Sequence, residues 1–255
     1  MATPPPLQAL LFDMDGTLAD TEDAHCAAFN QAFAEADLDW YWDEARYTRL
    51  LEVAGGQERM LHDWRQRQPD LGGTSLEAAQ SLLRDVHARK TAAYARLVEQ
   101  GAVVLRPGVL ELLLSARLEG LRLAIVTTTT ASNVGAVLQR ALGPQWRHTF
   151  AVVEDASTAT RKKPHPQAYL QALERLGLPA AACIAFEDSA TGLAAAVQAG
   201  LRTVVTPTRF TRHHDFSGAW RVLQSLQDCT PEQLRTATKN TLSETSPCPS
   251  PSDSR

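Results

Sequence analysis

The sequence FDMDGTLAD, residues 12–20, decides the fold, because it places two acidic residues directly after an apolar run. Residues 9–12 are all apolar, and we predict that they form a buried strand. Asp13 and Asp15, at positions i and i+2, extend from the end of this strand toward one space. No basic residue nearby in the sequence pairs with them, so their repulsion requires a cation. A hard divalent ion with oxygen ligands fits, and magnesium is the common choice beside phosphate.

Four more apolar runs follow along the chain and alternate with helical patterns. The predicted strands are residues 121–126, 150–153, 183–186 and 202–205. The predicted helices are residues 108–119, 132–142, 166–176 and 191–199, several of them closed by glycine. Strict alternation of strand and helix implies a parallel, doubly wound sheet with right-handed crossovers, so the predicted fold class is α/β.

Residues 21–95 interrupt this alternation with long amphipathic helical patterns and no convincing strand. We expect a helical cap domain here, inserted into a catalytic core of residues 1–20 and 96–235. Ligands of open parallel sheets bind beyond the carboxyl ends of the strands, so an insertion leaving from that edge lies over the site as a lid. Residues 236–255, rich in Ser, Thr and Pro, are predicted to be a disordered tail without a catalytic role.

Three further segments place polar residues where a phosphate site needs them. Thr127 follows the apolar run LAIV, Lys163 precedes Pro164 in RKKPHPQAY, and Asp188 comes two residues after CIAF. Taken singly, each has an ordinary explanation: a polar approach to a helix, an exposed turn, or an acidic strand end. The DMDG segment likewise has one, a solvated turn with Gly16 at a positive φ. Four such motifs in this order are hard to obtain by chance.

Together these motifs resemble the four signature motifs of the haloacid dehalogenase phosphohydrolases, including the complete DxDGT sequence that ends at Thr17. The resemblance implies that Asp13 attacks phosphorus and forms an aspartyl phosphate. It implies that Asp15 protonates the leaving oxygen and then activates water. Thr127 would hydrogen-bond the phosphoryl group, and Lys163 would neutralise the nucleophile and the phosphate.

The same resemblance implies a Mg2+ site made by Asp13, Asp188 and the backbone carbonyl of Asp15. Glu187 is assigned a supporting role beside this site, with direct metal ligation as the alternative, and Lys162 is taken as a solvated neighbour of Lys163. Further phosphate contacts are expected at the start of the following helix, where free backbone N–H groups favour an anion. The candidates there are Thr128, Thr129 and Asn133.

The resemblance covers about residues 7–225 and lies in the branch that contains beta-phosphoglucomutase. Within it, several stretches are closer to the CbbY-like xylulose-1,5-bisphosphate phosphatases: LADTEDAH, AFN, GGQERM, HARKTAAY, LRPGV and TRHHDF. This implies xylulose-1,5-bisphosphate, an inhibitor of the carbon-fixing enzyme rubisco in autotrophs, as the preferred substrate. One stretch departs from the family: residues 154–160 read EDASTAT where a Gly-Asp pair is usual, so no contact is assigned to that loop.

A bisphosphate needs a second cationic pocket under the cap. Arg59, preceded by the flexible Gly55 and Gly56, is suited to clamp the distal phosphate with bidentate hydrogen bonds, unless it is an ordinary helix-surface cation. Weaker candidates nearby are Tyr47, Arg49 and Gln57.

Three more cap or hinge residues are candidates for substrate binding. Lys90 resembles a lysine that reaches the substrate in related enzymes, although a solvated helix face is its alternative. Asp20 and His25 flank the hinge into the cap and are expected to hydrogen-bond the sugar hydroxyls of the substrate or to position Asp15. A structural role is the alternative for His25.

The overall composition excludes several classes of function. A net charge of -4 and a pI near 6.0 give no bulk attraction to nucleic acid or to an anionic membrane. Four cysteines without metal or redox spacing are expected to be reduced thiols. No secretion signal and no run approaching about 20 apolar residues is present. We therefore expect a cytoplasmic protein that binds a small phosphorylated sugar, and a monomer, since no stretch indicates an interface.

Alternatives to this phosphatase stay open. A sugar phosphomutase of the same fold would return the phosphoryl group to a second hydroxyl, and Thr17 favours hydrolysis only weakly. A phosphatase of another small substrate, such as phosphoglycolate, is a third possibility. A magnesium- or phosphate-binding module without turnover is the non-enzymatic alternative, against which the joint presence of Asp13, Asp15, Lys163 and Asp188 argues.

Overall fold

A computed structural model describes residues 5–53, 55–227 and 229–236 of the chain. Its main sheet has the strand order β5-β4-β1-β6-β7-β8, and every neighbouring pair runs parallel. The strands are β1 (Ala9–Phe12), β4 (Arg122–Val126), β5 (Val152–Glu154), β6 (Cys183–Glu187), β7 (Arg202–Val205) and β8 (Arg221–Val222). The predicted α/β class with a parallel, doubly wound sheet is confirmed.

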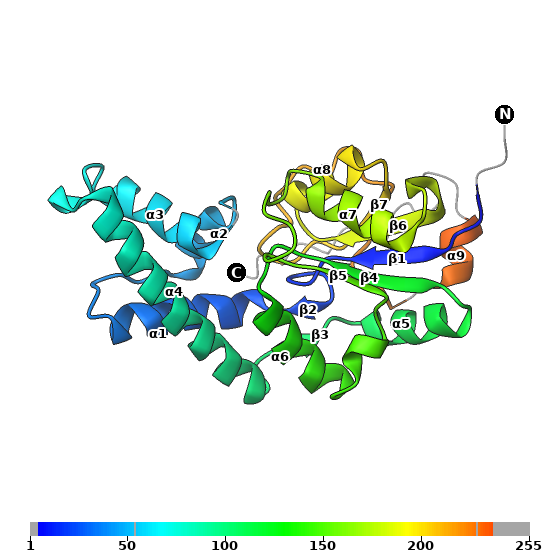
Figure 1. Ribbon diagram of the computed structural model, residues 1–255, viewed down its shortest axis with the longest axis horizontal. Helices are drawn as coiled ribbons and strands as arrows, with labels where there is room; N and C mark the ends of the chain where they lie inside the picture. Colours follow the sequence, from blue (N-terminus) through cyan, green and yellow to red (C-terminus); the bar gives the residue numbers. More distant parts are fainter. Residues whose placement is uncertain (1–4, 54, 228, 237–255) are drawn as a thin grey trace, which may run out of the picture.

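Helices cover both faces of this sheet (Figure 1). Successive side chains of β1 alternate between the faces, as the pleat of a strand requires. Leu10 and Phe12 pack in the cluster that includes α5 and α6, whereas Ala9 and Leu11 pack in the cluster that includes α7 and α8. The helices of this part are α5 (Val109–Leu118), α6 (Ala131–Leu142), α7 (Gln167–Leu176), α8 (Ala190–Gln198) and α9 (Pro231–Thr236).

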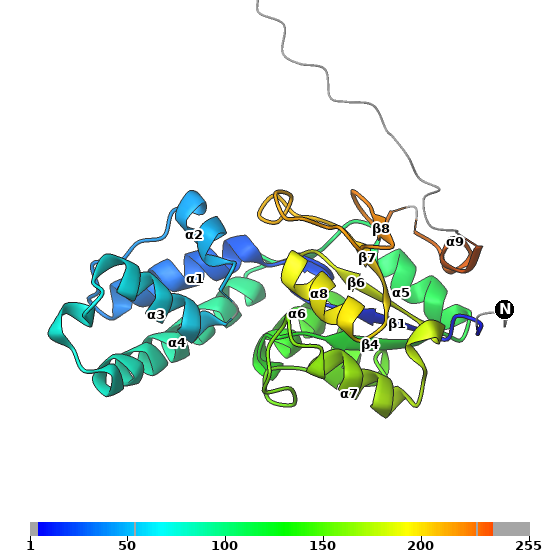
Figure 2. The ribbon, with the colours of Figure 1, turned by 90° about the horizontal axis from the view of Figure 1, so that it is seen from above.

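Four helices between β2 and β3 lie together to one side of the sheet (Figures 1 and 2). They are α1 (Glu22–Glu35), α2 (Glu44–Leu50), α3 (Gly56–Arg67) and α4 (Leu76–Glu99). They have an apolar cluster of their own around Phe33 and Trp42. Within it the fully buried carboxylate of Asp63 accepts hydrogen bonds from Trp42 Nε1 at 2.8 Å and Arg46 Nε at 2.7 Å. We refer to α1–α4 as the cap; α4 continues past residue 95, the predicted end of this unit.

A short antiparallel ribbon connects the cap to the rest of the chain. It consists of β2 (Ala19–Asp20) and β3 (Val104–Leu105), so the chain enters and leaves the cap side by side. Neither strand was predicted, because two residues are too few to show a hydrophobic period.

In the part of the chain that the structure describes, no helix is both long and apolar enough to span a bilayer. The predicted disordered tail lies outside the described residues, except for Thr236 at the end of α9.

Candidate active site

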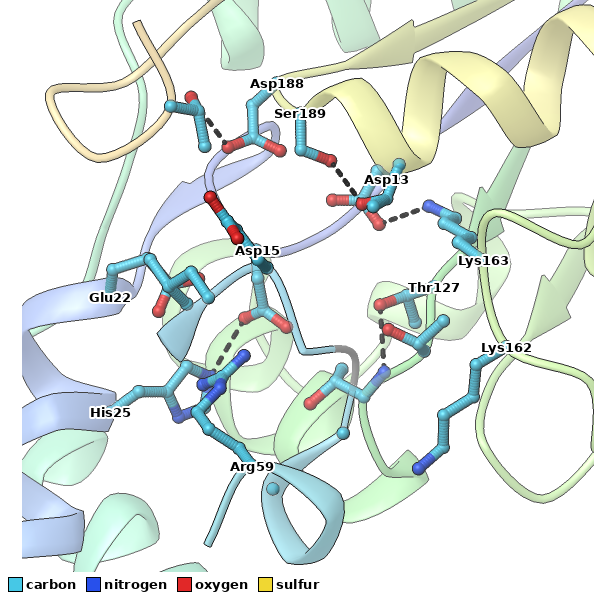
Figure 3. A pocket seen from close by; sticks show the side chains of 18 of the residues that line it. Asp13, Asp15, Glu22, His25, Arg59, Thr127, Lys162, Lys163, Asp188 and Ser189 are labelled. Carbon is cyan, nitrogen blue, oxygen red and sulfur yellow. Dashed lines mark hydrogen bonds and ion pairs between the residues drawn. The ribbon is translucent and has the colours of Figure 1, made fainter. Parts of the chain in front are cut away.

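The four sequence motifs meet at the carboxyl edge of the sheet because β1 lies between β4 and β6. The backbone N–H of Asp13 donates to the carbonyl of Phe186 at 3.0 Å, so the end of β1 is held against the end of β6. Asp13, Thr127 and Asp188 all line one cavity of about 640 Å³, to which the cap also contributes side chains. Figure 3 shows these residues facing the cavity.

Lys163 is the cation nearest to Asp13. Its Nζ lies 2.6 Å from Asp13 Oδ1, 2.6 Å from Glu187 Oε1 and 2.8 Å from the carbonyl of Val126, and its side chain is almost fully buried. Tyr169 also donates to Glu187 Oε1. One lysine therefore ties together the ends of β1, β4 and β6. Glu187 pairs with this lysine through Oε1. Its other oxygen, Oε2, is buried and has no hydrogen-bond partner among the described residues.

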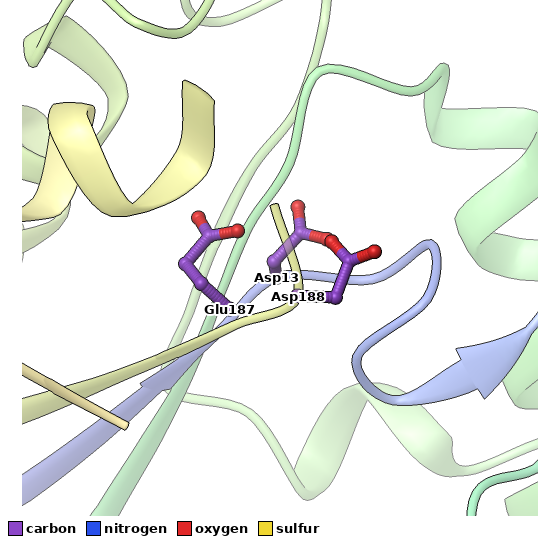
Figure 4. A group of neighbouring side chains, drawn as sticks. All are labelled: Asp13, Glu187 and Asp188. Atoms are coloured by element: carbon purple, nitrogen blue, oxygen red, sulfur yellow. The ribbon is translucent and has the colours of Figure 1, made fainter. Parts of the chain in front are cut away.

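The carboxylates of Asp13, Glu187 and Asp188 gather at these strand ends (Figure 4), with one oxygen of each within 4.8 Å of the others. Burial raises the pKa of Asp13 despite the nearby Lys163. Burial, Asp13 and Glu187 likewise raise the pKa of Asp188 well above its usual value. These shifts indicate more buried negative charge than one lysine offsets, and a divalent cation with oxygen ligands would relieve it. The residues therefore fit a metal ion.

Asp15 faces the cap rather than Lys163. Its Oδ1 lies 3.2 Å from His25 Nε2, and His25 Nδ1 lies 2.8 Å from Lys90 Nζ. The His25 ring stacks on Tyr94 with centroids 4.0 Å apart. Burial would raise the pKa of Asp15, but His25, Thr21 and Lys90 hold it below its usual value. Burial, in contrast, lowers the pKa of Lys90 to about 8. Sequence positions 15, 25 and 90 thus form one hydrogen-bonded row from the catalytic edge into the cap.

Polar side chains after β4 form another wall of the cavity. Thr127 is buried, and its Oγ1 accepts a hydrogen bond from the backbone N–H of Thr129 at 3.2 Å. Asn133 Nδ2 donates to Thr129 Oγ1 at 3.0 Å, and the side chain of Thr130 caps the start of α6. The predicted candidates Thr127, Thr128, Thr129 and Asn133 all line the cavity.

Arg59 enters the cavity from the cap. Its Nε donates to the carbonyl of Leu50 at 3.0 Å and its Nη1 to Tyr47 Oη at 3.2 Å, so the guanidinium is held in place before any ligand arrives. Gly55 and Gly56 line the same part of the cavity, as does Gln57.

Three of the predicted candidates do not line the cavity. Tyr47 is buried in the cap, where its hydroxyl accepts a hydrogen bond from Arg59. Asp20 is the second residue of β2; Ala19 before it is buried, so the alternation of the strand turns Asp20 to the exposed side. Arg49 is exposed on α2 and does not line the cavity either. In the loop to which no contact was assigned, Glu154 pairs with Arg175 at 2.7 Å.

The structure also brings residues to the cavity that sequence reasoning missed. Lys162, predicted to be a solvated neighbour, lines the cavity and pairs with Glu58 at 2.5 Å; that prediction was wrong. His87 from α4 lines it as well. Thr211 belongs to the TRHHDF stretch, and its Oγ1 donates to Asp188 Oδ2 at 3.3 Å. The resemblance of that stretch to relatives was the only signal for Thr211, and the doubled lysine the only one for Lys162.

Comparison with known proteins places this site in a family. A family model described as haloacid dehalogenase-like hydrolase matches residues 7–200, the span that holds Asp13, Thr127, Lys163 and Asp188. The chain belongs to the haloacid dehalogenase-like hydrolases. The CbbY protein encoded on a plasmid of Cupriavidus necator is 53% identical to it over 226 residues, which cover 87% of each chain. The resemblance predicted from the motifs is confirmed.

Two solved structures of this hydrolase family are similar over nearly their whole length. CbbY from Rhodobacter sphaeroides in complex with phosphate is 40% identical, with a TM-score of 0.79 covering 87% of this chain and 96% of that one. A mutant of the same CbbY in complex with xylulose-1,5-bisphosphate is 38% identical, with the same TM-score and coverage. The hydrolase fold of the chain is thereby confirmed.

Proposed function

We propose that the protein is a magnesium-dependent phosphatase that hydrolyses xylulose-1,5-bisphosphate to xylulose 5-phosphate and phosphate. The observation that carries this proposal is the contact between Lys163 Nζ and Asp13 Oδ1, at 2.6 Å, on the wall of a cavity that the cap shares. Support for the substrate comes from the similarity to R. sphaeroides CbbY, a mutant of which has been solved in complex with this bisphosphate.

In the first half of the reaction, a carboxylate oxygen of Asp13 attacks phosphorus in line with the departing sugar oxygen. The new O–P bond makes an aspartyl phosphate, the old P–O bond breaks, and Asp15 gives its proton to the sugar oxygen. The hydrogen bond with His25 lowers the pKa of Asp15 and so keeps it a carboxylate before substrate binds. A phosphate beside Asp15 raises its pKa, which favours uptake of the required proton.

In the second half, Asp15 accepts a proton from a water molecule that attacks the aspartyl phosphate, and phosphate leaves. Lys163 and the hydroxyl of Thr127 contact the equatorial phosphate oxygens, where charge develops. Because Lys163 is already held by the carbonyl of Val126, it needs little rearrangement during either step.

Magnesium would be held by Asp13, Asp188 and the backbone carbonyl of Asp15. When bound, it offsets the negative charge that the phosphate adds to the two aspartates. Thr211 orients Asp188 through its 3.3 Å hydrogen bond, and Gly16 leaves room for it, since a Cβ at that position would overlap the Asp188 carboxylate.

A direct assay tests this function. Wild-type protein with xylulose-1,5-bisphosphate and Mg2+ is expected to release free phosphate in equal amount to xylulose 5-phosphate, and EDTA is expected to abolish the release. Movement of the phosphoryl group between positions without free phosphate would indicate a phosphomutase instead. Faster turnover of phosphoglycolate than of the bisphosphate would contradict the proposed substrate.

Arg59→Ala is expected to lower kcat/KM for the bisphosphate by roughly 10- to 100-fold, because a held guanidinium contributes charge-assisted hydrogen bonds to the distal phosphate. The loss should be much smaller for p-nitrophenyl phosphate, which has one phosphate. Arg49→Ala is the matched control, because Arg49 lies nearby but outside the cavity. An unchanged preference between the two substrates in Arg59→Ala would refute the clamp.

His25→Ala is expected to lower kcat roughly 10- to 100-fold, because Asp15 loses the partner that orients it. The pKa of Asp15 should also rise, because His25 holds it down in the wild type, so the limb of the kcat/KM profile that reports the ionisation of Asp15 should move to higher pH. His62→Ala, at an exposed position of α3, serves as the control. A reduced rate with an unmoved pH profile would contradict the positioning of Asp15 by His25.

A further inference from the structure

An ion pair between two residues that line the cavity joins the sheet side of the molecule to the cap. Lys162 Nζ, in the loop after β5, lies 2.5 Å from Glu58 Oε1 near the start of α3. Both side chains line the cavity that contains Asp13. In Figure 3 the amine of Lys163 reaches toward Asp13, whereas that of Lys162 points away from it. Two successive lysines therefore contact different acidic groups of one cavity, Lys163 those at the sheet edge and Lys162 one in the cap.

The place of this pair is determined by the backbone of the cap. Gly55 has a φ of 99°, and a Cβ built there would overlap both Lys162 Nζ and Glu58 Oε2. The ion pair thus lies directly against the peptide that begins α3, beside Arg59. A side chain at position 55 would push the amine and the carboxylate away from this spot.

Glu58 places a negative charge in a cavity that must bind a negatively charged substrate. Burial would raise the pKa of Glu58, but the hydrogen bonds from Lys162 and from its own backbone hold it below the usual value, so Glu58 is ionised at neutral pH. An anion that lines a phosphate-binding cavity repels the substrate unless a cation pairs with it. Arg59 already uses Nε and Nη1 on Leu50 and Tyr47. Among the described residues, Lys162 is the neighbouring cation whose contacts are with an acidic side chain alone.

We propose that Lys162 is a specificity-determining residue whose amine exchanges Glu58 for the second phosphate of the substrate. This inference rests on the proposed bisphosphate phosphatase. In the free protein the Glu58 carboxylate occupies the position of that phosphate oxygen, held by the same amine and the same turn at Gly55. A phosphate carries more negative charge than a carboxylate and more acceptor oxygens, so it competes for the three N–H donors of the lysine. A monophosphate has no group for this position and leaves the ion pair in place.

The test compares variants of Lys162 with variants of Glu58, and it measures how each changes the preference for a bisphosphate over a monophosphate. For Lys162→Gln, the ratio of kcat/KM for xylulose-1,5-bisphosphate to that for p-nitrophenyl phosphate is expected to fall roughly 10-fold or more. For Glu58→Gln the same ratio is expected to rise, because the competing anion is gone. Lys162→Arg should retain most of the ratio. Arg161→Gln removes the same charge from the neighbouring exposed residue and should change the ratio by less than about 2-fold, since solvent screens it.

Different outcomes separate this inference from the function on which it rests. If Lys162→Gln and Glu58→Gln lower the ratio equally, the pair is only a structural link and the inference is overturned. An unchanged ratio in Lys162→Gln overturns it as well. In either case the wild-type protein still releases phosphate from the bisphosphate, and the proposed function stands. If the wild-type protein releases none, the proposed function is overturned and the role of Lys162 with it.

Discussion

Asp13→Asn is expected to reduce phosphate release by at least about 10³-fold, because the amide keeps the size of the side chain but lacks the nucleophilic charge. Acid-quenched wild-type protein should carry a phosphoryl group on the peptide that contains Asp13, and the variant should carry none. Mass spectrometry of the digested protein measures this directly, and the loss should not depend on which phosphate monoester is supplied.

The fold of this variant should survive. The carboxylate of Asp13 is buried beside Asp188 and Glu187, and burial disfavours its charged form, so a neutral amide relieves repulsion. Its melting temperature is expected to equal or exceed that of the wild type. Asp85→Asn, on the exposed face of α4, is the matched control for activity. Turnover in Asp13→Asn within about 10-fold of the wild type would contradict nucleophilic attack by Asp13.

Lys163→Met is expected to lower both stability and activity. The substitution leaves the buried Asp13 and Glu187 without their shared cation, which costs about 3–5 kcal/mol in free energy of unfolding. Turnover should fall at least about 10²-fold, because the attacking carboxylate and the phosphate then repel each other without a fixed positive charge. Urea denaturation and phosphate release measure the two effects.

The loss of stability in Lys163→Met should depend on pH in a defined direction. Without the lysine, the already raised pKa of Asp13 rises further, so the folded state binds a proton that the unfolded state releases. Stability of the variant therefore falls as pH rises, and its deficit relative to the wild type should grow above about pH 8, where Asp13 of the wild type is ionised and that of the variant still holds a proton.

The neighbouring lysine is the control for this stability effect. Lys162→Met removes a partly exposed pair and should cost no more than about 1 kcal/mol. Equal deficits for the two lysine variants would contradict the structural role of Lys163.

The parallel sheet and the residues at its carboxyl edge could be predicted from the sequence alone. Residues 9–12 and 202–205 were predicted as strands with the bounds the structure has, because buried parallel strands are rich in apolar or β-branched residues and are followed by polar ones. The alternation with helices then required a parallel order. That order brings Asp13, Thr127 and Asp188 to one edge without knowledge of any side-chain conformation.

Contacts between distant segments could not be predicted in the same way. The ribbon of β2 and β3 is too short for a hydrophobic period, although it joins the cap to the sheet. The exposed position of Asp20 follows from one residue of register within that ribbon. Lys162 and Glu58 are 104 residues apart, and nothing local to either of them signals its partner.

The sequence by itself therefore determined the fold class, the family and the set of polar groups at the strand ends, because these depend on local periodicity and on residue order. The sequence also assigned Lys163 to Asp13, whereas only the tertiary structure showed that the adjacent Lys162 pairs with Glu58 of the cap. The tertiary structure also decided that Asp15 is joined through His25 to Lys90. Such pairings depend on how the cap lies against the sheet, which is set by many packing contacts rather than by any one motif.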